Sequence, residues 1–112
     1  MNYPKEIQLG GHIIKVELIN NRIVSENDNH VADFCRDNNT IRIAVMLEDG
    51  TYKSLSFINE CLHHEILEAI NEVFCLEFEQ DEIDRIAQGY VQVLGQLGIR
   101  LIDVESGTQG TA

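Results

Sequence analysis

Positive charge is scarce in this chain. Eight lysine and arginine residues oppose nineteen aspartate and glutamate residues among 112, which gives a formal net charge of −11. A surface with this excess of carboxylates repels the phosphates of nucleic acids and anionic lipid headgroups. The sequence therefore predicts a protein that binds neither nucleic acids nor membranes.

Long apolar runs and paired cysteines are also lacking. No stretch approaches the roughly 18 apolar residues of a membrane span, and the opening MNYPKEIQL has neither the basic nor the apolar region of a signal peptide. Cys35, Cys61 and Cys75 are an odd number without CxxC spacing, which argues against a disulfide framework. We therefore expect a reducing, cytoplasmic location.

The first half of the chain has the pattern of β-strands. Gly10-Gly11 separates two runs of β-type residues, and Asp37-Asn38-Asn39 separates two more. Each arrangement is typical of a hairpin. In the last of these runs Ile41, Ile43 and Val45 share one face. We expect two hairpins that form a small antiparallel sheet.

The second half has the pattern of helices. Apolar residues recur at helical spacing over about residues 54–74 and again over 80–97, and Gly98 is a suitable helix stop. Two packed helices after an antiparallel sheet make an α+β fold. We expect one domain over residues 1–104, followed by a flexible tail at 105–112.

The stretch LHHEILEAI, residues 62–70, nearly spells HExxH, a helical motif in which two histidines hold zinc and the glutamate is the general base. His64 and Glu68 are four residues apart and share one stripe of the helix, while Glu65 lies between that stripe and the apolar face. Glu68 stands where the second histidine would be. The alternative is an amphipathic helix whose His64 packs at the edge of the core.

A metal ion would need a third protein ligand. On the second helix Glu82 leads the apolar line Ile86, Tyr90 and Val93, and Glu79 leads the line Ile83, Ile86 and Tyr90. Both carboxylates therefore point along the expected buried side. A buried carboxylate is costly unless it is paired, protonated or bound to a metal. The alternative is that both lie in solvent before the helix begins.

The segment ECLHHEILEAINEVFCLEF, followed by DEIDRIAQGYVQVLGQLG, resembles a family of small phage and prophage proteins. These are minimal zincins, distantly similar to the ImmA/IrrE metallopeptidases, and the resemblance covers roughly residues 5–98. It implies a zincin-like fold with His64 as the first metal ligand, Glu65 as the general base and Glu82 as the downstream glutamate ligand. Glu68 departs from the family's second histidine. A His-Glu-Glu set is harder than a His-His-Glu set, which favours Mn²⁺ beside Zn²⁺.

These observations give three functional hypotheses. The first is a phage-type zincin-like protein with a divalent metal at His64, Glu68 and Glu82, acting as a peptide hydrolase. Glu65 would then be catalytic, and the 41–45 strand would receive an extended substrate by edge pairing. The second is an inactive zincin-derived interaction protein that binds a basic partner. The third, based on the charge alone, is a DNA-mimicking inhibitor. The first two predict a protein or peptide partner.

Overall fold

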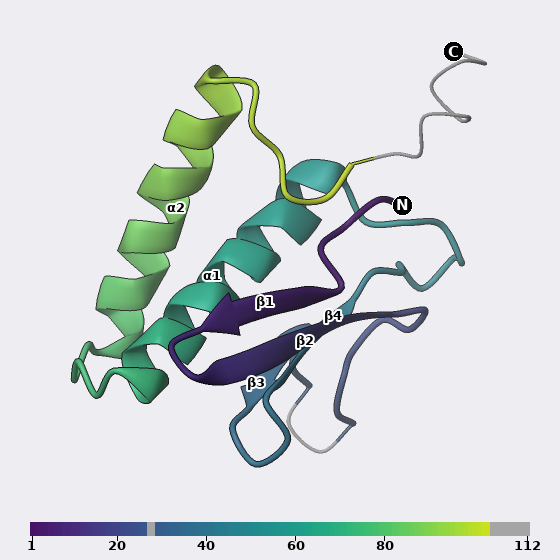
Figure 1. The fold of residues 1–112 in the computed structure, drawn as a ribbon. Helices are drawn as coiled ribbons and strands as arrows, with labels where there is room; N and C mark the ends of the chain where they lie inside the picture. The colour runs from purple at the N-terminus through teal and green to yellow at the C-terminus, as the bar shows by residue number, and fades with distance from the viewer. Residues whose placement is uncertain (27–28, 104–112) are drawn as a thin grey trace.

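The computed structural model describes residues 1–26 and 29–103, so the predicted tail at 105–112 and the domain boundary at 104 lie outside the described residues. The fold is α+β, as predicted: a four-stranded sheet and two helices (Figure 1). The elements in chain order are β1 (Glu6–Leu9), β2 (His12–Ile19), β3 (Ala32–Cys35), β4 (Thr40–Ala44), α1 (Leu55–Val73) and α2 (Gln80–Gln96).

The sheet is mixed, with strand order β1-β2-β4-β3. β1 pairs antiparallel with β2 across the Gly10-Gly11 turn, and β3 pairs antiparallel with β4, but β2 and β4 run parallel. The prediction of an antiparallel sheet is therefore wrong. β4 is almost entirely buried, and it occupies a central position between β2 and β3. The most buried strand thus has a neighbour on each side, and β3 is left at the edge.

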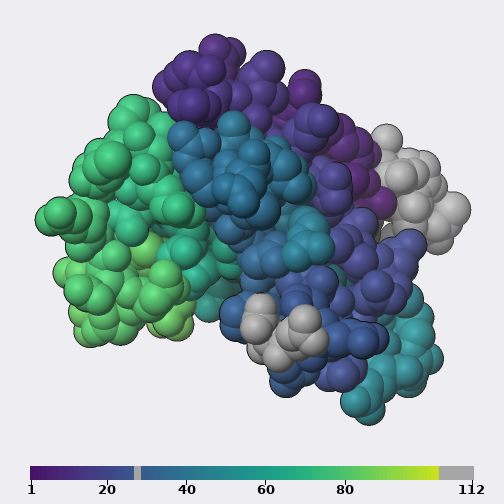
Figure 2. Space-filling model, turned by 90° about the horizontal axis from the view of Figure 1, so that it is seen from below, coloured from purple at the N-terminus to yellow at the C-terminus, as the bar shows by residue number. Residues whose placement is uncertain are grey.

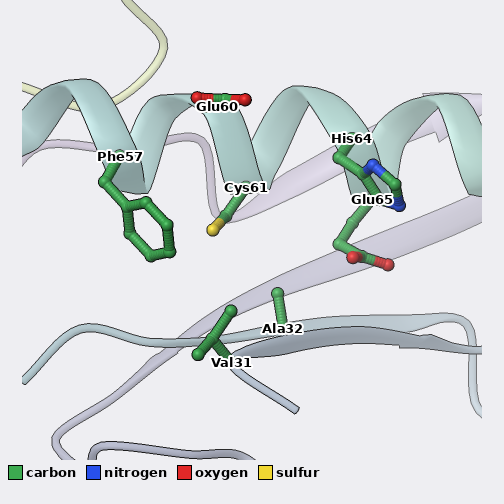
Figure 3. Close-up of a pocket in the computed structure, with 7 residues that line it drawn as sticks. All are labelled: Val31, Ala32, Phe57, Glu60, Cys61, His64 and Glu65. Atoms are coloured by element: carbon green, nitrogen blue, oxygen red, sulfur yellow. The ribbon is translucent and has the colours of Figure 1, made fainter. Parts of the chain in front are cut away.

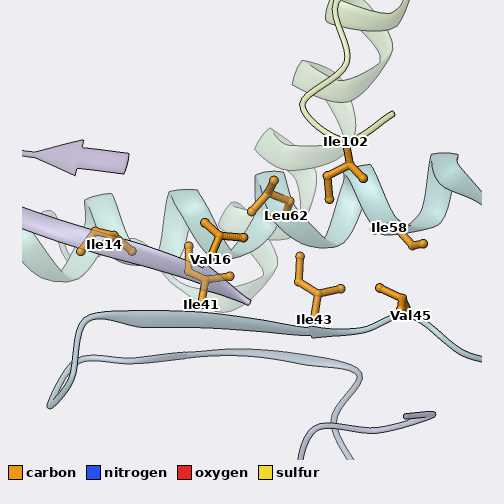
Figure 4. Close-up of a cluster of buried hydrophobic side chains, with 8 residues drawn as sticks. All are labelled: Ile14, Val16, Ile41, Ile43, Val45, Ile58, Leu62 and Ile102. Carbon is orange, nitrogen blue, oxygen red and sulfur yellow. The ribbon is translucent and has the colours of Figure 1, made fainter. Parts of the chain in front are cut away.

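The core lies between the sheet and α1 (Figure 4). Alternate residues of β2 and β4 point toward the helix, as the period of a strand requires. Their partners on α1 are Ile58 and Leu62, four residues apart on one helical face. The fully or nearly fully buried side chains of this cluster are Ile14, Val16, Ile41, Ile43, Val45, Ile58, Leu62 and Ile102.

Both helices begin and end close to the predicted positions. Ser54 caps α1, and its hydroxyl accepts a hydrogen bond from the backbone N–H of Phe57 at 3.2 Å. Gly98 follows the C-cap of α2 with a φ of +76°, the left-handed conformation that ends many helices. α2 packs on the side of α1 that faces away from the sheet, and the two helices run antiparallel (Figure 1).

Only part of the predicted apolar face of α2 is buried. Ile83 and Ala87 are its buried residues, whereas Tyr90 and Val93, expected to face inward, are more than half exposed. Tyr90 lies seven residues after Ile83 on the same side of the helix, so contact with α1 covers the first half of this side and not the second.

Asn59 ties the segment after α2 to the start of α1. Its buried amide accepts hydrogen bonds from the backbone N–H groups of Leu101 and Ile102 and donates to the carbonyls of Ile102 and Leu55. Near the end of the described residues, Asn2 and Asp103 form an isolated antiparallel bridge. None of the helices among the described residues is long and apolar enough to cross a membrane.

Candidate functional site: a groove between α1 and the edge strand

A groove separates α1 from β3, the edge strand of the sheet. Two adjoining hollows form it and share Ala32, His64 and Glu65. Figure 3 shows the hollow that also includes Phe57 and Cys61. In the space-filling view the helices and the strands meet along this side of the molecule (Figure 2). The other lining residues are His30, Val31, Asp33, Phe34, Phe57, Glu60, Cys61, Glu68, Gln80 and Asp84.

Glu65, the predicted general base, points from α1 toward β3 (Figure 3). The residue is only 7% exposed. Burial, together with a smaller contribution from the nearby carboxylates of Glu68, Asp33 and Asp84, raises the pKa of this carboxyl to about 8. At neutral pH Glu65 is therefore mostly a neutral acid. A buried acid in a groove, with its pKa close to neutrality, is a common feature of functional sites.

His64 and Glu68 both face α2. The Nδ1 atom of His64 lies 2.8 Å from a carboxylate oxygen of Asp84, and the Gln80 amide donates a hydrogen bond of 2.7 Å to the carboxylate of Glu68. Gln80 and Asp84 are themselves four residues apart, so the spacing on α2 matches the spacing on α1. The four residues form two cross-helix pairs, which we call the polar ladder.

Glu82 is placed elsewhere. Its carboxylate accepts a hydrogen bond of 2.8 Å from the backbone N–H of Glu79, and together these residues make the capping box at the start of α2. The side chain that we expected beside His64 therefore satisfies a helix N-terminus, and Asp84 contacts His64 in its stead. Of the apolar residues on the inward line that we assigned to Glu82, Ile86 is half-buried, while Tyr90 and Val93 are more than half exposed.

The residues present do not fit a metal ion as they are arranged. In the described part of the chain, no three histidine, cysteine, aspartate or glutamate side chains are grouped so that they could hold one. The polar ladder already engages His64 and Glu68, the first two expected ligands. The predicted set of His64, Glu68 and Glu82 thus remains a hypothesis that would need the side chains to rearrange.

A cysteine nucleophile is a second possibility in the same groove, because Cys61 lies one turn before His64. Burial, with a smaller contribution from the neighbouring Glu65, raises the pKa of the Cys61 thiol to about 12. The thiolate is the nucleophilic form, so this cysteine is inert near neutral pH.

Sequence reasoning missed Asp84 and Gln80. The available signal was their own four-residue spacing at the start of α2, opposite an equally spaced pair on α1. A short connection between two helices favours antiparallel packing, which brings the two pairs together. The connection is fixed by Asn71, whose amide bonds both the N–H and the carbonyl of Phe78.

Comparisons with protein-family models, with curated proteins and with solved structures find no match for this chain.

Proposed function

We propose that this chain is a zincin-like protein of the phage type that binds an extended, basic polypeptide segment in the groove beside β3 without cleaving it. The single observation that carries the proposal is the polar ladder, because it engages the expected metal-ligand positions with partners inside the protein while the groove and the strand edge stay open.

The edge of β3 supports pairing with another strand. The N–H of Ala44 donates to the carbonyl of Val31, so the pair Val31–Ala44 is hydrogen-bonded. Hydrogen-bonded pairs alternate along an antiparallel ladder. The backbone groups of Ala32 and Phe34 therefore point away from β4, toward the free edge. The 41–45 strand, our expected docking strand, is paired on both sides and has no edge to offer. β3 takes that role.

The charge of the groove supports a basic ligand. Glu60, Glu65 and Glu68 line it from α1, whereas Asp33 is already paired with Arg42, whose guanidinium holds it from the neighbouring strand. A lysine or arginine side chain placed beside Glu65 would favour its ionised form, since an opposite charge nearby lowers a carboxyl pKa. Binding would then release a proton near pH 7, and affinity should rise as pH increases toward 8.

The test uses a short strand-forming peptide with alternating valine and lysine, and the same peptide with glutamate in place of lysine. We expect the lysine peptide to shift the amide NMR signals of Ala32 and Phe34 and to bind more tightly at pH 8 than at pH 6. The glutamate peptide should not bind.

Two substitutions of Ala32 sharpen this test. Ala32→Pro removes an outward N–H and spares the ladder to β4, so it should abolish binding in a folded protein. A proline placed in a helix, such as Gln88→Pro in α2, is not a suitable control for Ala32→Pro because it would break the helix. The matched control is Ala32→Val, which keeps the N–H and should bind normally. Equal binding by Ala32→Pro and the parent protein would refute strand pairing.

The second candidate function is metal-dependent peptide hydrolysis, and Glu65 is the observation that favours it. Its position in the groove beside the open strand edge is suited to proton transfer to or from a bound peptide. Elemental analysis of untagged protein, with His64→Ala as control, separates the two. About one metal per parent chain, lost in the variant, together with cleavage of the lysine peptide, would replace our proposal with the hydrolase.

A further inference from the structure

A row of exposed apolar side chains runs along α2. Ile86, Tyr90, Val93 and Leu97 recur at intervals of four, three and four residues, the spacing of a helix–helix seam. Ile86 is half-buried, whereas Tyr90, Val93 and Leu97 are 56%, 55% and 67% exposed. Tyr90 lies seven residues after the buried Ile83, on the same side of the helix, so contact with α1 covers the N-terminal half of this side and leaves its C-terminal half exposed.

The row continues into an apolar groove between the helices. Tyr90 stands at its rim and so belongs to both surfaces. The side chains that line the groove most directly are Ile66, Leu67, Ile70, Tyr90, Leu94 and Leu101. Together the row and this groove form a surface that we call the α2 face.

Charge indicates what can cover the α2 face. Residues 86–99 contain no charged side chain, in a chain whose net charge is −11. Two copies of such an acidic protein repel each other over most of their surfaces, but not across this one. Gly89 also lies beside the row, and no described atom comes within 4 Å of the position that a Cβ would take there. A glycine inside a helix costs about 1 kcal/mol relative to alanine, and packing within one chain does not require it.

The ends of α2 indicate the orientation. Its N-terminal side carries Glu77, Glu79, Asp81, Glu82 and Asp84, and Arg100 follows its C-terminal end. Parallel helices would place acid against acid. In an antiparallel pair centred between Tyr90 and Val93, the Arg100 end of one copy lies near the acidic end of the other.

We propose that the α2 face binds a second copy of this chain, with the two α2 helices antiparallel about a twofold axis. At roughly 150–250 Å² for a large side chain, the half-exposed row presents about 400 Å². A standard interface takes about 800 Å² from each partner. The groove and the neighbouring glutamines supply part of the remainder, so this is a weak dimer with a dissociation constant on the order of 10–100 µM. The tail sequence VESGTQGTA offers one large apolar side chain, Val104, which is too little to cover the face.

The test is sedimentation equilibrium of the full chain between about 5 and 500 µM, a range that brackets a weak interface. The parent protein should pass from monomer to dimer. Val93→Glu should weaken association at least tenfold. Gln88→Glu adds the same charge at an exposed position of α2 outside the row, and should weaken it less than twofold. Circular dichroism verifies that both variants remain folded.

Arg100→Glu tests the orientation. In the antiparallel pair it places a carboxylate near the acidic end of the partner and should weaken the dimer several-fold at low salt. An unchanged dissociation constant would overturn the antiparallel arrangement. A parent protein that is monomeric at every concentration would overturn the proposal, and the face would then belong to a different partner. A dimer that Val93→Glu leaves intact would overturn it as well.

Discussion

The Glu65→Gln substitution removes a buried carboxyl while keeping the shape of the side chain. Glu65 ordinarily has a pKa of 4.5, and its place in the groove raises this to about 8. Between these values the folded state keeps a proton that the unfolded state has released. The free energy of unfolding should therefore fall as pH rises from about 4.5 to about 8, because stability falls wherever the unfolded state binds fewer protons.

The magnitude follows from the two pKa values. At about 1.36 kcal/mol per pH unit, the full difference corresponds to about 5 kcal/mol. The groove is open to water, and an effective dielectric constant near 20 reduces the cost of the ionised form. We expect a loss of about 2–4 kcal/mol between pH 5 and pH 8 from this one group.

The glutamine variant has no such titration. Its stability should equal that of the parent near pH 5 and exceed it by about 2–4 kcal/mol near pH 8. Burial also lowers the pKa of His63, which makes stability rise with pH, but this contribution is common to both proteins and cancels in the difference. Urea denaturation of both proteins at pH 5, 6, 7 and 8 measures this difference in the free energy of unfolding. Glu72→Gln, at an exposed position on the same helix, is the control. Parallel stability curves for parent and Glu65→Gln would refute the argument.

Three further variants test the fold and the site. Asn59→Ala removes four hydrogen bonds that hold the segment after α2, so it should cost about 2–4 kcal/mol in urea denaturation; a cost below 1 kcal/mol would contradict the role of this amide. Gly10→Ala forces alanine to a φ of +60° and should lower the free energy of unfolding by about 1–2 kcal/mol. The matched control is Gly11→Ala, which should be tolerated because the φ of Gly11 is not positive. The double variant Glu68→His with Gln80→Glu supplies a His-His-Glu set with His64 and should increase zinc affinity in calorimetric titrations. Equal, negligible binding by parent and variant would show that the two helices cannot host a metal.

Local sequence signals were sufficient to predict the helices. Ser54 before an apolar run and Gly98 after one act through the backbone groups that a helix leaves unpaired at its ends. These interactions lie within a few residues of each other, so no knowledge of the rest of the chain is needed. The Gly10-Gly11 turn between β1 and β2 is a local feature in the same sense.

Strand order depends on contacts between distant residues, and there the sequence was insufficient. β4 lies between β2 and β3 and pairs parallel with β2, although β3 separates the two in the chain. The pattern of Ile41, Ile43 and Val45 shows that one face is buried, and it says nothing about how many edges are paired. For this reason the docking edge was assigned to β4 instead of β3.

How far the packing extends along α2 was the second point that sequence could not decide. Ile83, Ala87 and Tyr90 recur at intervals of four and three residues and so share one face, yet Ile83 and Ala87 are buried and Tyr90 is 56% exposed. The periodicity gives the direction of an apolar face, and it does not say over what length that face contacts α1. Glu82, which we expected beside His64, accepts a hydrogen bond from the backbone N–H of Glu79, and Asp84 pairs with His64.

The HExxE pattern is ambiguous as a sequence motif. A metal site and a ladder of hydrogen bonds between antiparallel helices both require side chains four residues apart on one stripe, so His64 and Glu68 satisfy either requirement. The facing helix distinguishes them, because a metal needs a further anionic or imidazole donor beside both residues, whereas a hydrogen-bonded ladder needs one complementary group for each. α2 presents the amide of Gln80 to Glu68 and the carboxylate of Asp84 to His64, one partner apiece. Glutamate at position 68 is suited to that amide donor, and this complementarity favours a helix pair held by its own side chains over one held by an ion.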